Sequence, residues 1–289
     1  MGYYNKALDE IDFQIVQAKD ILKPYIHSFW AVKKDKIDSA LTHKILSDGC
    51  MGITINFKAP YSIKVNGNTH LCSKPFIING ATKHPSYMRF EKELELIGVR
   101  FTPAGAFVFF EEDIDAFVDK HSDLNSAHNW RLEELYQELK SKETVENKVA
   151  LLETFLIQKL TSSKKKNSPW IFSLIEKIHQ KKGDTDIISV CHEFNISMRQ
   201  LERRFKQEVG LTPKVFARII RLRHVKDTLS NLEVDDLTTA AYDTGFFDQA
   251  HFTREFRYFM NETPKNYFNH KRLQAKLYNY RKHEFDLRK

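Results

Sequence analysis

The chain has 289 residues, enough for about two domains, and 42% of them are hydrophobic, which suits ordinary buried cores. It contains no run of 18 or more uncharged apolar residues, and its polar, acidic start, MGYYNKALDEIDFQ, lacks the basic and apolar regions of a secretory signal. We therefore expect a cytoplasmic protein that does not associate with membranes. The three cysteines form no CxxC pair, so the sequence indicates neither a disulfide framework nor a zinc knuckle.

The positive charge is concentrated in the second half of the chain. Residues 161–289 contain 25 Lys and Arg against 16 Asp and Glu, which leaves 20 and 22 of the chain totals of 45 and 38 for residues 1–160. A basic region joined to a near-neutral one suggests that the basic region meets a polyanion. A solvated basic surface without a partner is the alternative.

Short apolar runs alternate with turn-forming pieces from about Phe29 to Phe101. The runs SFWAV, GITINF, YSIKV, PFIING and LELIGVRF are rich in Ile, Val and Phe, and pieces such as SDGCMG and KVNGNTH separate them. Several short strands at this spacing predict a small antiparallel barrel or sandwich.

Helical spacing replaces the strand pattern after Pro103. AGAFVFF, at 104–110, predicts a short helix, and apolar residues recur every three to four positions over 130–139 and 145–160. The two longer segments predict amphipathic helices. Their apolar faces could pack on their own domain or form a dimerisation surface, and the sequence leaves both open.

A polar, basic run, TSSKKKNSP, follows these helices and marks the best domain boundary. We expect a sensory or dimerisation domain over residues 1–160, a linker over 161–168 and a DNA-binding domain over 169–289. The last of these three assignments depends on a repeat within the basic region.

Residues 190–216 and 240–268 resemble each other. VCHEFNISMRQLERRFKQEVGLTPKVF aligns with AAYDTGFFDQAHFTREFRYFMNETPKNYF at an offset of 50 before a turn and of 51 after it. The inserted residue falls in the turn, where a repeated helix-turn-helix tolerates a change of length best.

Both copies contain the residue types that a helix-turn-helix corner requires. Asn195 and Gly245 stand where the chain leaves the first helix in a left-handed conformation. Ser197 and Asp248 are the expected N-caps of the second helix. Apolar side chains spaced i and i+4 on that helix are expected to face the core: Leu201 with Phe205, and Phe252 with Phe256.

The remaining side chains of each second helix face outward and suit the DNA major groove. Guanidinium groups can pair with guanine, an amide with adenine and a carboxylate with cytosine, while a short side chain can contact the thymine methyl group. One such unit could be an ordinary helical corner, but two in a basic region favour DNA reading. The candidate DNA-binding residues are Arg199, Glu202, Arg203 and Lys206 in the first copy and Gln249, Ala250, Thr253, Arg254 and Arg257 in the second.

One helix is predicted between the two copies, over residues 213–229, with proline near its start. At 1.5 Å per residue it is about 25 Å long. This length suits two recognition helices placed near the spacing of about 34 Å between successive major-groove faces. A single monomer could then contact two adjacent groove segments.

The region from about residue 170 to 270 resembles the AraC/XylS family of bacterial transcription regulators. The motifs LERRFKQEVGLTPKVF, RLRHV and GFFDQAHFTREFRYFMNETPKNYF carry the resemblance. It implies a seven-helix DNA-binding domain with two helix-turn-helix units, and a separate N-terminal domain that senses a ligand, dimerises, or both. It maps the base-reading faces onto Arg199, Glu202 and Arg203, and onto Gln249, Ala250, Thr253 and Arg254. Small departures from the family pattern occur at Val190, Asn195, Ala250 and Asn261.

The expected fold class is α+β: a small N-terminal antiparallel β-barrel or sandwich, cupin-like, with flanking helices, followed by an all-α domain with two helix-turn-helix units. The expected function is a sequence-specific DNA-binding transcription regulator that is not an enzyme and needs no cofactor. Its expected partner is double-stranded DNA. RNA polymerase, a small-molecule effector and a second copy of the chain are further partners that such a regulator allows.

The main alternative is a metal-binding or enzymatic N-terminal module fused to a DNA-binding domain. Its candidate ligands would be His43, His70, His84 and Cys72, but no HxH, HExxH or CxxC spacing occurs, and phosphate loops and GxSxG are absent. No catalytic or metal-binding residue is therefore predicted. RNA binding is disfavoured because no aromatic-rich strand lies in the basic region. An interaction module without nucleic acid remains a further alternative.

Overall fold

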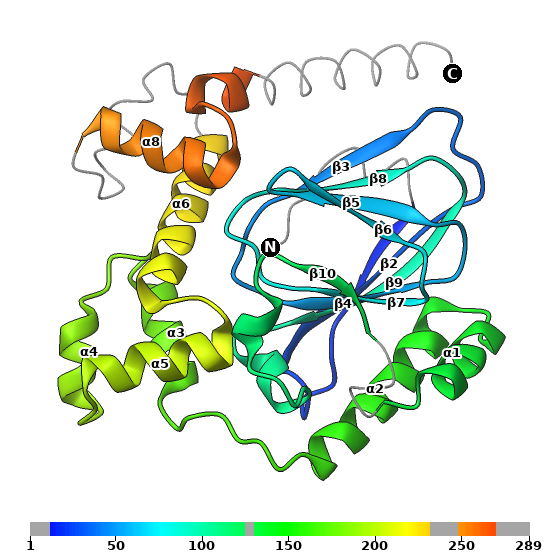
Figure 1. Ribbon diagram of the computed structural model, residues 1–289, viewed down its shortest axis with the longest axis horizontal. Coiled ribbons are helices and arrows are strands. Elements are labelled where there is room, and N and C mark those ends of the chain that lie inside the picture. The colour runs from blue at the N-terminus through cyan, green and yellow to red at the C-terminus, as the bar shows by residue number, and fades with distance from the viewer. Residues whose placement is uncertain (1–11, 125–129, 232–247, 270–289) are drawn as a thin grey trace. The chain divides into compact units, whose positions relative to one another are not determined.

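The computed structural model describes residues 12–124, 130–231 and 248–269 (Figure 1). The chain divides into two compact units, Met1–Ile219 and Ile220–Lys289, and each is described by itself. The first unit contains two β-sheets and the first helix-turn-helix, and the second contains the helix predicted to be the second reading helix.

The larger sheet of the first unit has six antiparallel strands. Their order is β1-β2-β9-β4-β7-β10. The strands are β1 (Phe13–Val16), β2 (Ile26–Lys34), β4 (Gly52–Asn56), β7 (Phe76–Asn79), β9 (Leu94–Phe101) and β10 (His121–Asp123).

The smaller sheet has four antiparallel strands in the order β3-β8-β5-β6. They are β3 (Leu41–Ile45), β5 (Tyr61–Val65), β6 (Asn68–Cys72) and β8 (Ser86–Phe90). Asn66 and Gly67 join β5 to β6 with φ angles of 51° and 82°. Positive φ at both central residues is what a tight two-residue hairpin requires, and Asn-Gly adopts it readily.

The predicted antiparallel N-terminal domain is confirmed, and its two sheets do not close into a barrel. Strand β9 shows how both faces of the larger sheet are buried. Leu94 and Leu96 join the core between the two sheets, whereas Ile97, Val99 and Phe101 join a second core on the opposite face. A strand buried on both faces explains why LELIGVRF reads as a nearly continuous apolar run.

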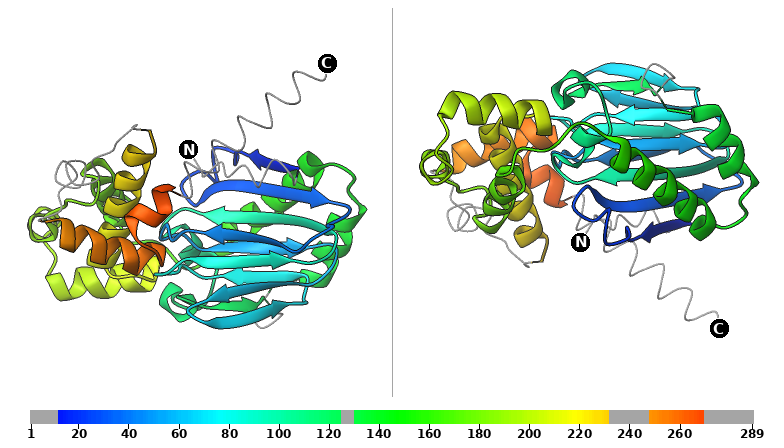
Figure 2. Two further views of the ribbon diagram at one scale, coloured as in Figure 1. Left: turned by 90° about the horizontal axis from the view of Figure 1, so that it is seen from above. Right: turned by 90° about the horizontal axis from the view of Figure 1, so that it is seen from below.

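Two helices cover the second core, α1 (Leu132–Ser141) and α2 (Val145–Ser162) (Figure 2). Their buried apolar side chains pack into the same cluster as β4 and β9. Packing on their own domain was one of the two arrangements that the sequence left open. The dimerisation role remains a prediction. The buried side chains are Leu135, Leu139, Val149, Leu152 and Leu156.

The short helix predicted at 104–110 is confirmed over part of its length. Only Gly105–Val108 form a 3-10 turn, η2, and a second such turn, η3, covers Ile114–Phe117. The chain enters η2 through Ala104 in a left-handed conformation, φ 66°, and a Cβ on Gly105 would lie 2.1 Å from the carbonyl oxygen of Tyr25. This close approach leaves no room for a side chain at position 105, so only glycine fits there.

The described residues of the C-terminal part fold into helices joined by short connections, as predicted. Residues 163–170 separate α2 from the next helix, and the division between compact units falls later, within α6. The predicted domain boundary at 161–168 therefore remains a prediction. No helix in the described ranges combines the length and the apolar character needed to cross a bilayer. The helices are α3 (Ile171–Gln180), α4 (Ile187–Glu193), α5 (Met198–Val209), α6 (Pro213–Asn231) and α8 (Gln249–Met260).

Candidate nucleic-acid interface

The first helix-turn-helix consists of α4, a short turn and α5. Asn195 has φ 50°, the left-handed conformation predicted for it, and Ile196 N then donates to Cys191 O at 3.0 Å. The Ser197 hydroxyl accepts from Gln200 N at 3.2 Å, which confirms the predicted N-cap of α5. These bonds satisfy backbone groups that would otherwise be unpaired at the helix ends.

The inner face of α5 fixes its orientation. Leu201 and Phe205 are fully buried, Val190 of α4 is 2% exposed, and the Phe205 ring lies 5.7 Å from that of Phe216. The opposite face presents the predicted DNA-binding side chains to solvent. All four, Arg199, Glu202, Arg203 and Lys206, are exposed.

Helix α8 has the same construction. The Asp248 carboxylate accepts from His251 N at 2.6 Å, which confirms Asp248 as the N-cap, and Phe252 and Phe256 are buried. Thr253 is half-buried, whereas the other predicted residues, Gln249, Ala250, Arg254 and Arg257, are exposed. The predicted first helix and turn of this unit, with Ala240, Gly245 and Phe246, lie outside the described residues.

The repeat extends beyond the reading helices. Gly210 and Asn261, 51 residues apart, end α5 and α8 in left-handed conformations with φ 89° and 56°. Thr212 and Thr263 then cap the next turns by accepting from backbone N–H groups at 3.3 and 3.2 Å. The aromatic pairs that follow are equally spaced: Phe205 with Phe216 at 5.7 Å, and Phe256 with Tyr267 at 5.5 Å. Two segments with the same caps and ring contacts are two copies of one structural unit.

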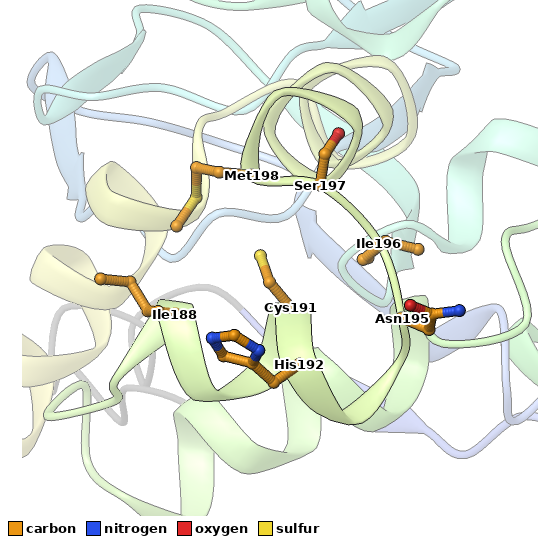
Figure 3. A pocket seen from close by; sticks show the side chains of 7 residues that line it. All are labelled: Ile188, Cys191, His192, Asn195, Ile196, Ser197 and Met198. Atoms are coloured by element: carbon orange, nitrogen blue, oxygen red, sulfur yellow. The ribbon is translucent and has the colours of Figure 1, made fainter.

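A cavity of about 620 Å³ lies at the corner between α4 and α5 (Figure 3). Ile188, 60% exposed, and Met198 supply its apolar side, and Cys191 and His192 line it from α4. Burial raises the pKa of the Cys191 thiol, with Glu202 adding to the effect, so this cysteine stays protonated at neutral pH.

The histidines considered for a metal site do not form one. Among the residues that the structure describes, no three His, Cys, Asp or Glu side chains are grouped closely enough to hold a metal ion. Cys72 lies between the sheets, where burial raises its pKa to about 12, and burial likewise lowers the pKa of His43. A thiol with this pKa is a poor ligand and a poor nucleophile.

A half-buried chain of polar side chains near Cys72 was not predicted from the sequence. His121 Nδ1 donates to Asn79 Oδ1 at 3.0 Å, and Asn79 Nδ2 donates to Thr54 Oγ1 at 2.8 Å. Burial and the neighbouring His70 lower the pKa of His121 to about 4. The three residues come from strands far apart in the chain, so only the pairing of β4, β7 and β10 brings them together.

Parts of the chain are similar to known protein families and to curated relatives. Residues 190–270 match a family described as a helix-turn-helix domain, and residues 14–123 match a domain of unknown function, DUF6597. The HTH-type transcriptional activator RhaS of Escherichia coli O157:H7 (strain EC4115 / EHEC) is 36% identical over 78 residues, 27% of this chain and 28% of that protein. RhaS of Pectobacterium carotovorum subsp. carotovorum (strain PC1) is 33% identical over the same length. The chain thus matches less than a third of the length of these curated relatives.

Solved structures give weaker similarity. ToxT from Vibrio cholerae covers 83% of this chain and 97% of its own, with 9% identity and a TM-score of 0.44. The C-terminal domain of AraT, a response regulator from Geobacillus stearothermophilus, covers 36% of this chain and 86% of its own, with 25% identity and a TM-score of 0.32.

The capped corner of α4 and α5, its second copy at α8 and the match over residues 190–270 define a helix-turn-helix protein. The curated relatives that match part of this chain are named HTH-type transcriptional activators. Residues 190–270 are therefore similar to a helix-turn-helix family, and the motifs that resemble the AraC/XylS regulators lie in the same region.

Proposed function

We propose that the protein is a sequence-specific DNA-binding transcription regulator in which α5 and α8 are the reading helices. The observation that carries this proposal is the repeated unit: each helix has a buried apolar face, a side-chain N-cap and an exposed face of mixed polar groups. A basic C-terminal half supplies the charge that attracts a polyanion.

The exposed groups divide by position along each helix. Near the start of α5, Arg199, Glu202 and Arg203 can reach base edges, because the N-terminal part of a recognition helix enters the groove most deeply. Lys206, in the last turn, suits a phosphate. In α8 the corresponding base-reading residues are Gln249, Ala250, Thr253 and Arg254, with Arg257 suited to a phosphate.

The sheet domain is proposed to sense an effector or to dimerise. It has two hydrophobic cores of its own, and it is joined to a domain whose relatives are named transcriptional activators. In this role the sheet domain is a binding module and not an enzyme.

The proposed function can be tested by selecting duplexes from a random pool with the full-length purified protein. The expected result is an enriched motif with two adjacent half-sites and an affinity that falls steeply with salt. An excess of single-stranded RNA should not displace the selected duplex. Failure to retain any duplex at low salt would favour an interaction module without nucleic acid.

Single substitutions then separate base reading from phosphate contact. Arg203→Ala and Arg254→Ala should each weaken binding to the selected site by about 1 to 3 kcal/mol and binding to random DNA much less. Arg89→Ala, on an exposed part of β8, is a matched control that removes one guanidinium without touching either reading helix. Equal losses on selected and random DNA would assign the arginine concerned to phosphate contact.

A further inference from the structure

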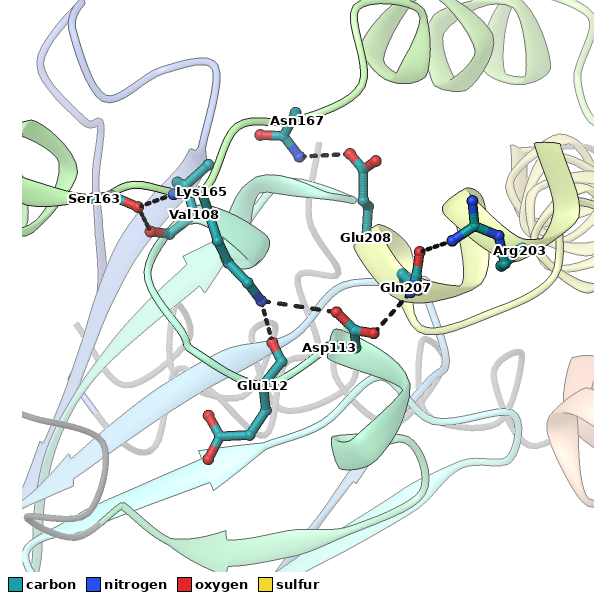
Figure 4. Close-up of polar contacts among 9 residues, drawn as sticks. All are labelled: Val108, Glu112, Asp113, Ser163, Lys165, Asn167, Arg203, Gln207 and Glu208. Atoms are coloured by element: carbon teal, nitrogen blue, oxygen red, sulfur yellow. Dashed lines mark hydrogen bonds and ion pairs between the residues drawn. The ribbon is translucent and has the colours of Figure 1, made fainter. Parts of the chain in front are cut away.

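An acidic segment of the sheet domain lies against the last turns of α5 (Figure 4). Residues 111–115 read Glu-Glu-Asp-Ile-Asp, and we call them the acidic segment. Gln207 Nε2 donates to Asp113 Oδ2 at 3.0 Å, and Lys206 Nζ lies 3.4 Å from Asp115 Oδ2. One face of the first reading helix therefore already has an anionic partner within the same compact unit.

Close packing holds this contact in place. Gly210, at the end of α5, has φ 89°, and a Cβ there would lie 2.8 Å from Val118 Cγ2 and 3.2 Å from Ile114 Cγ2. On the other side, Asn167 Nδ2 donates to Ala104 O at 3.0 Å, and Lys165 Nζ donates to Glu112 O at 2.7 Å. The helix end, the acidic segment and the chain leading into α3 are thus packed together.

The ion pair at the edge of this contact remains open to competition. The side chains of Lys206 and Asp115 are 56% and 32% exposed, so a second anion can reach the ammonium group. An exposed pair of this kind is weak and is screened by salt. Gln207 Oε1 also lies 3.4 Å from Arg203 Nη1, which links the acidic segment to the middle of the exposed face.

We propose that the acidic segment is an intramolecular competitor of DNA phosphate for the C-terminal end of α5. Lys206 is exposed in the last turn of α5, the part of a recognition helix that would lie at the groove edge beside phosphates when α5 enters the major groove. In the free protein the Asp115 carboxylate pairs with that ammonium group, and Asp113 accepts from the neighbouring Gln207. Binding of the first unit to DNA then requires exchange of these carboxylates for phosphates, so the sheet domain lowers DNA affinity through α5. The inference rests on the proposed function and specifies how its first reading helix is restrained.

The test compares DNA affinity of the full-length protein with that of Asp113→Asn/Asp115→Asn. Asparagine keeps an oxygen that can accept from Gln207, so the packing is retained while two negative charges are lost. The matched control, Asp38→Asn/Glu91→Gln, also removes two exposed carboxylates that are paired with Lys36 and Arg89. Asp38 and Glu91 follow and precede, along the chain, the end of the sheet where Lys34 of β2 pairs with Leu94 of β9. The eight residues of β9 place that end about 23 Å from Phe101, the strand end from which the chain continues to the acidic segment.

Neutralising the acidic segment should tighten binding to the selected duplex about three- to fivefold at 0.1 M salt, and the gain should shrink as salt rises. The control should change affinity by less than half as much. Equal gains in both variants, or no gain at Asp113→Asn/Asp115→Asn, would overturn the inference. Near-ultraviolet circular dichroism of both variants checks that the native packing persists.

A zero-length carbodiimide cross-link tests directly whether Lys206 and Asp115 are in contact. In the free protein, Lys206 and Asp115 are close enough to be joined as an amide, which peptide mass spectrometry detects. Saturating duplex should reduce the yield of this cross-link. An unchanged yield in protein that has bound the duplex would refute the competition alone, whereas absence of duplex binding by every variant would refute the proposed function.

Discussion

Glu208 connects two helices through a buried carboxylate. It is fully buried in α5, and its Oε2 accepts from Ser168 N at 2.9 Å and from Asn167 Nδ2 at 3.0 Å, while Oε1 accepts from the Ser168 hydroxyl. Ser168 O in turn accepts from Ile171 N at the start of α3. We predict that Glu208→Ala detaches α5 from this segment and lowers the free energy of unfolding.

The magnitude follows from the three donors that lose their acceptor. Each hydrogen bond to a charged group contributes about 1.5 to 3 kcal/mol, and the contributions within one network do not add. Unpaired buried donors bring the expected loss for Glu208→Ala to about 3 to 5 kcal/mol. Glu208→Gln should cost only about 1 kcal/mol, because its amide oxygen can replace Oε2 and the Ser168 hydroxyl can rotate to accept from the amide nitrogen.

Urea unfolding followed by far-ultraviolet circular dichroism measures both variants. Glu202→Ala is the matched control, since Glu202 is an exposed glutamate on the same helix and its loss should change stability by less than about 0.5 kcal/mol. If Glu208→Ala were no more destabilising than Glu202→Ala, the buried carboxylate would not hold α5 to the start of α3.

Three further predictions concern local geometry and charge. Gly210→Ala should lower the free energy of unfolding by more than about 1 kcal/mol in urea unfolding, because its φ of 89° and the 2.8 Å approach to Val118 both exclude a Cβ; an unchanged midpoint would show that the contact relaxes freely. Ser197→Ala and Asp248→Ala should each reduce helix stability by about 1 kcal/mol, with local hydrogen exchange rising only near the altered cap. The folded-state pKa of His121, about 4, lies below its ordinary 6.5, so the folded protein should lose stability as pH falls from about 6.5 to about 4, by at most about 3 kcal/mol. Denaturation midpoints measured across this range should fall more gently in His121→Gln, and equal slopes would remove His121 as the cause.

The features that the sequence predicted correctly are local ones. The left-handed Asn195 and the caps at Ser197 and Asp248 depend on residues within a few positions, and the buried faces of α5 and α8 follow from their apolar spacing. The repeat strengthens these predictions, because the same pattern of caps and apolar residues occurs twice at an offset of 51 beyond the turn. The second corner around Gly245 lies outside the described residues, and its form remains a prediction.

The features that the sequence did not predict depend on contacts between residues far apart in the chain. AGAFVFF has apolar residues that suit a helix, but only Gly105–Val108 form a 3-10 turn, and Gly105 there approaches Tyr25 O, in a segment about 80 residues earlier. Likewise, Gln207 and Asp113 are 94 residues apart, and Asn79 and His121 are 42 residues apart. Periodicity within a segment carries no information about which distant segment packs against it.

The two reading helices have cations at equivalent positions whose surroundings differ. Alignment places Lys206 and Arg257 at equivalent positions of the repeat, and periodicity correctly predicts that both face outward. An outward direction fixes the face that a side chain occupies but not the group that it meets there. Lys206 meets Asp115 of the sheet domain, so equivalence in the repeat does not make the two cations equally available to DNA. If Asp115 competes with phosphate, neutralising it should change the contribution of Lys206 to DNA affinity while leaving that of Arg257 unaltered.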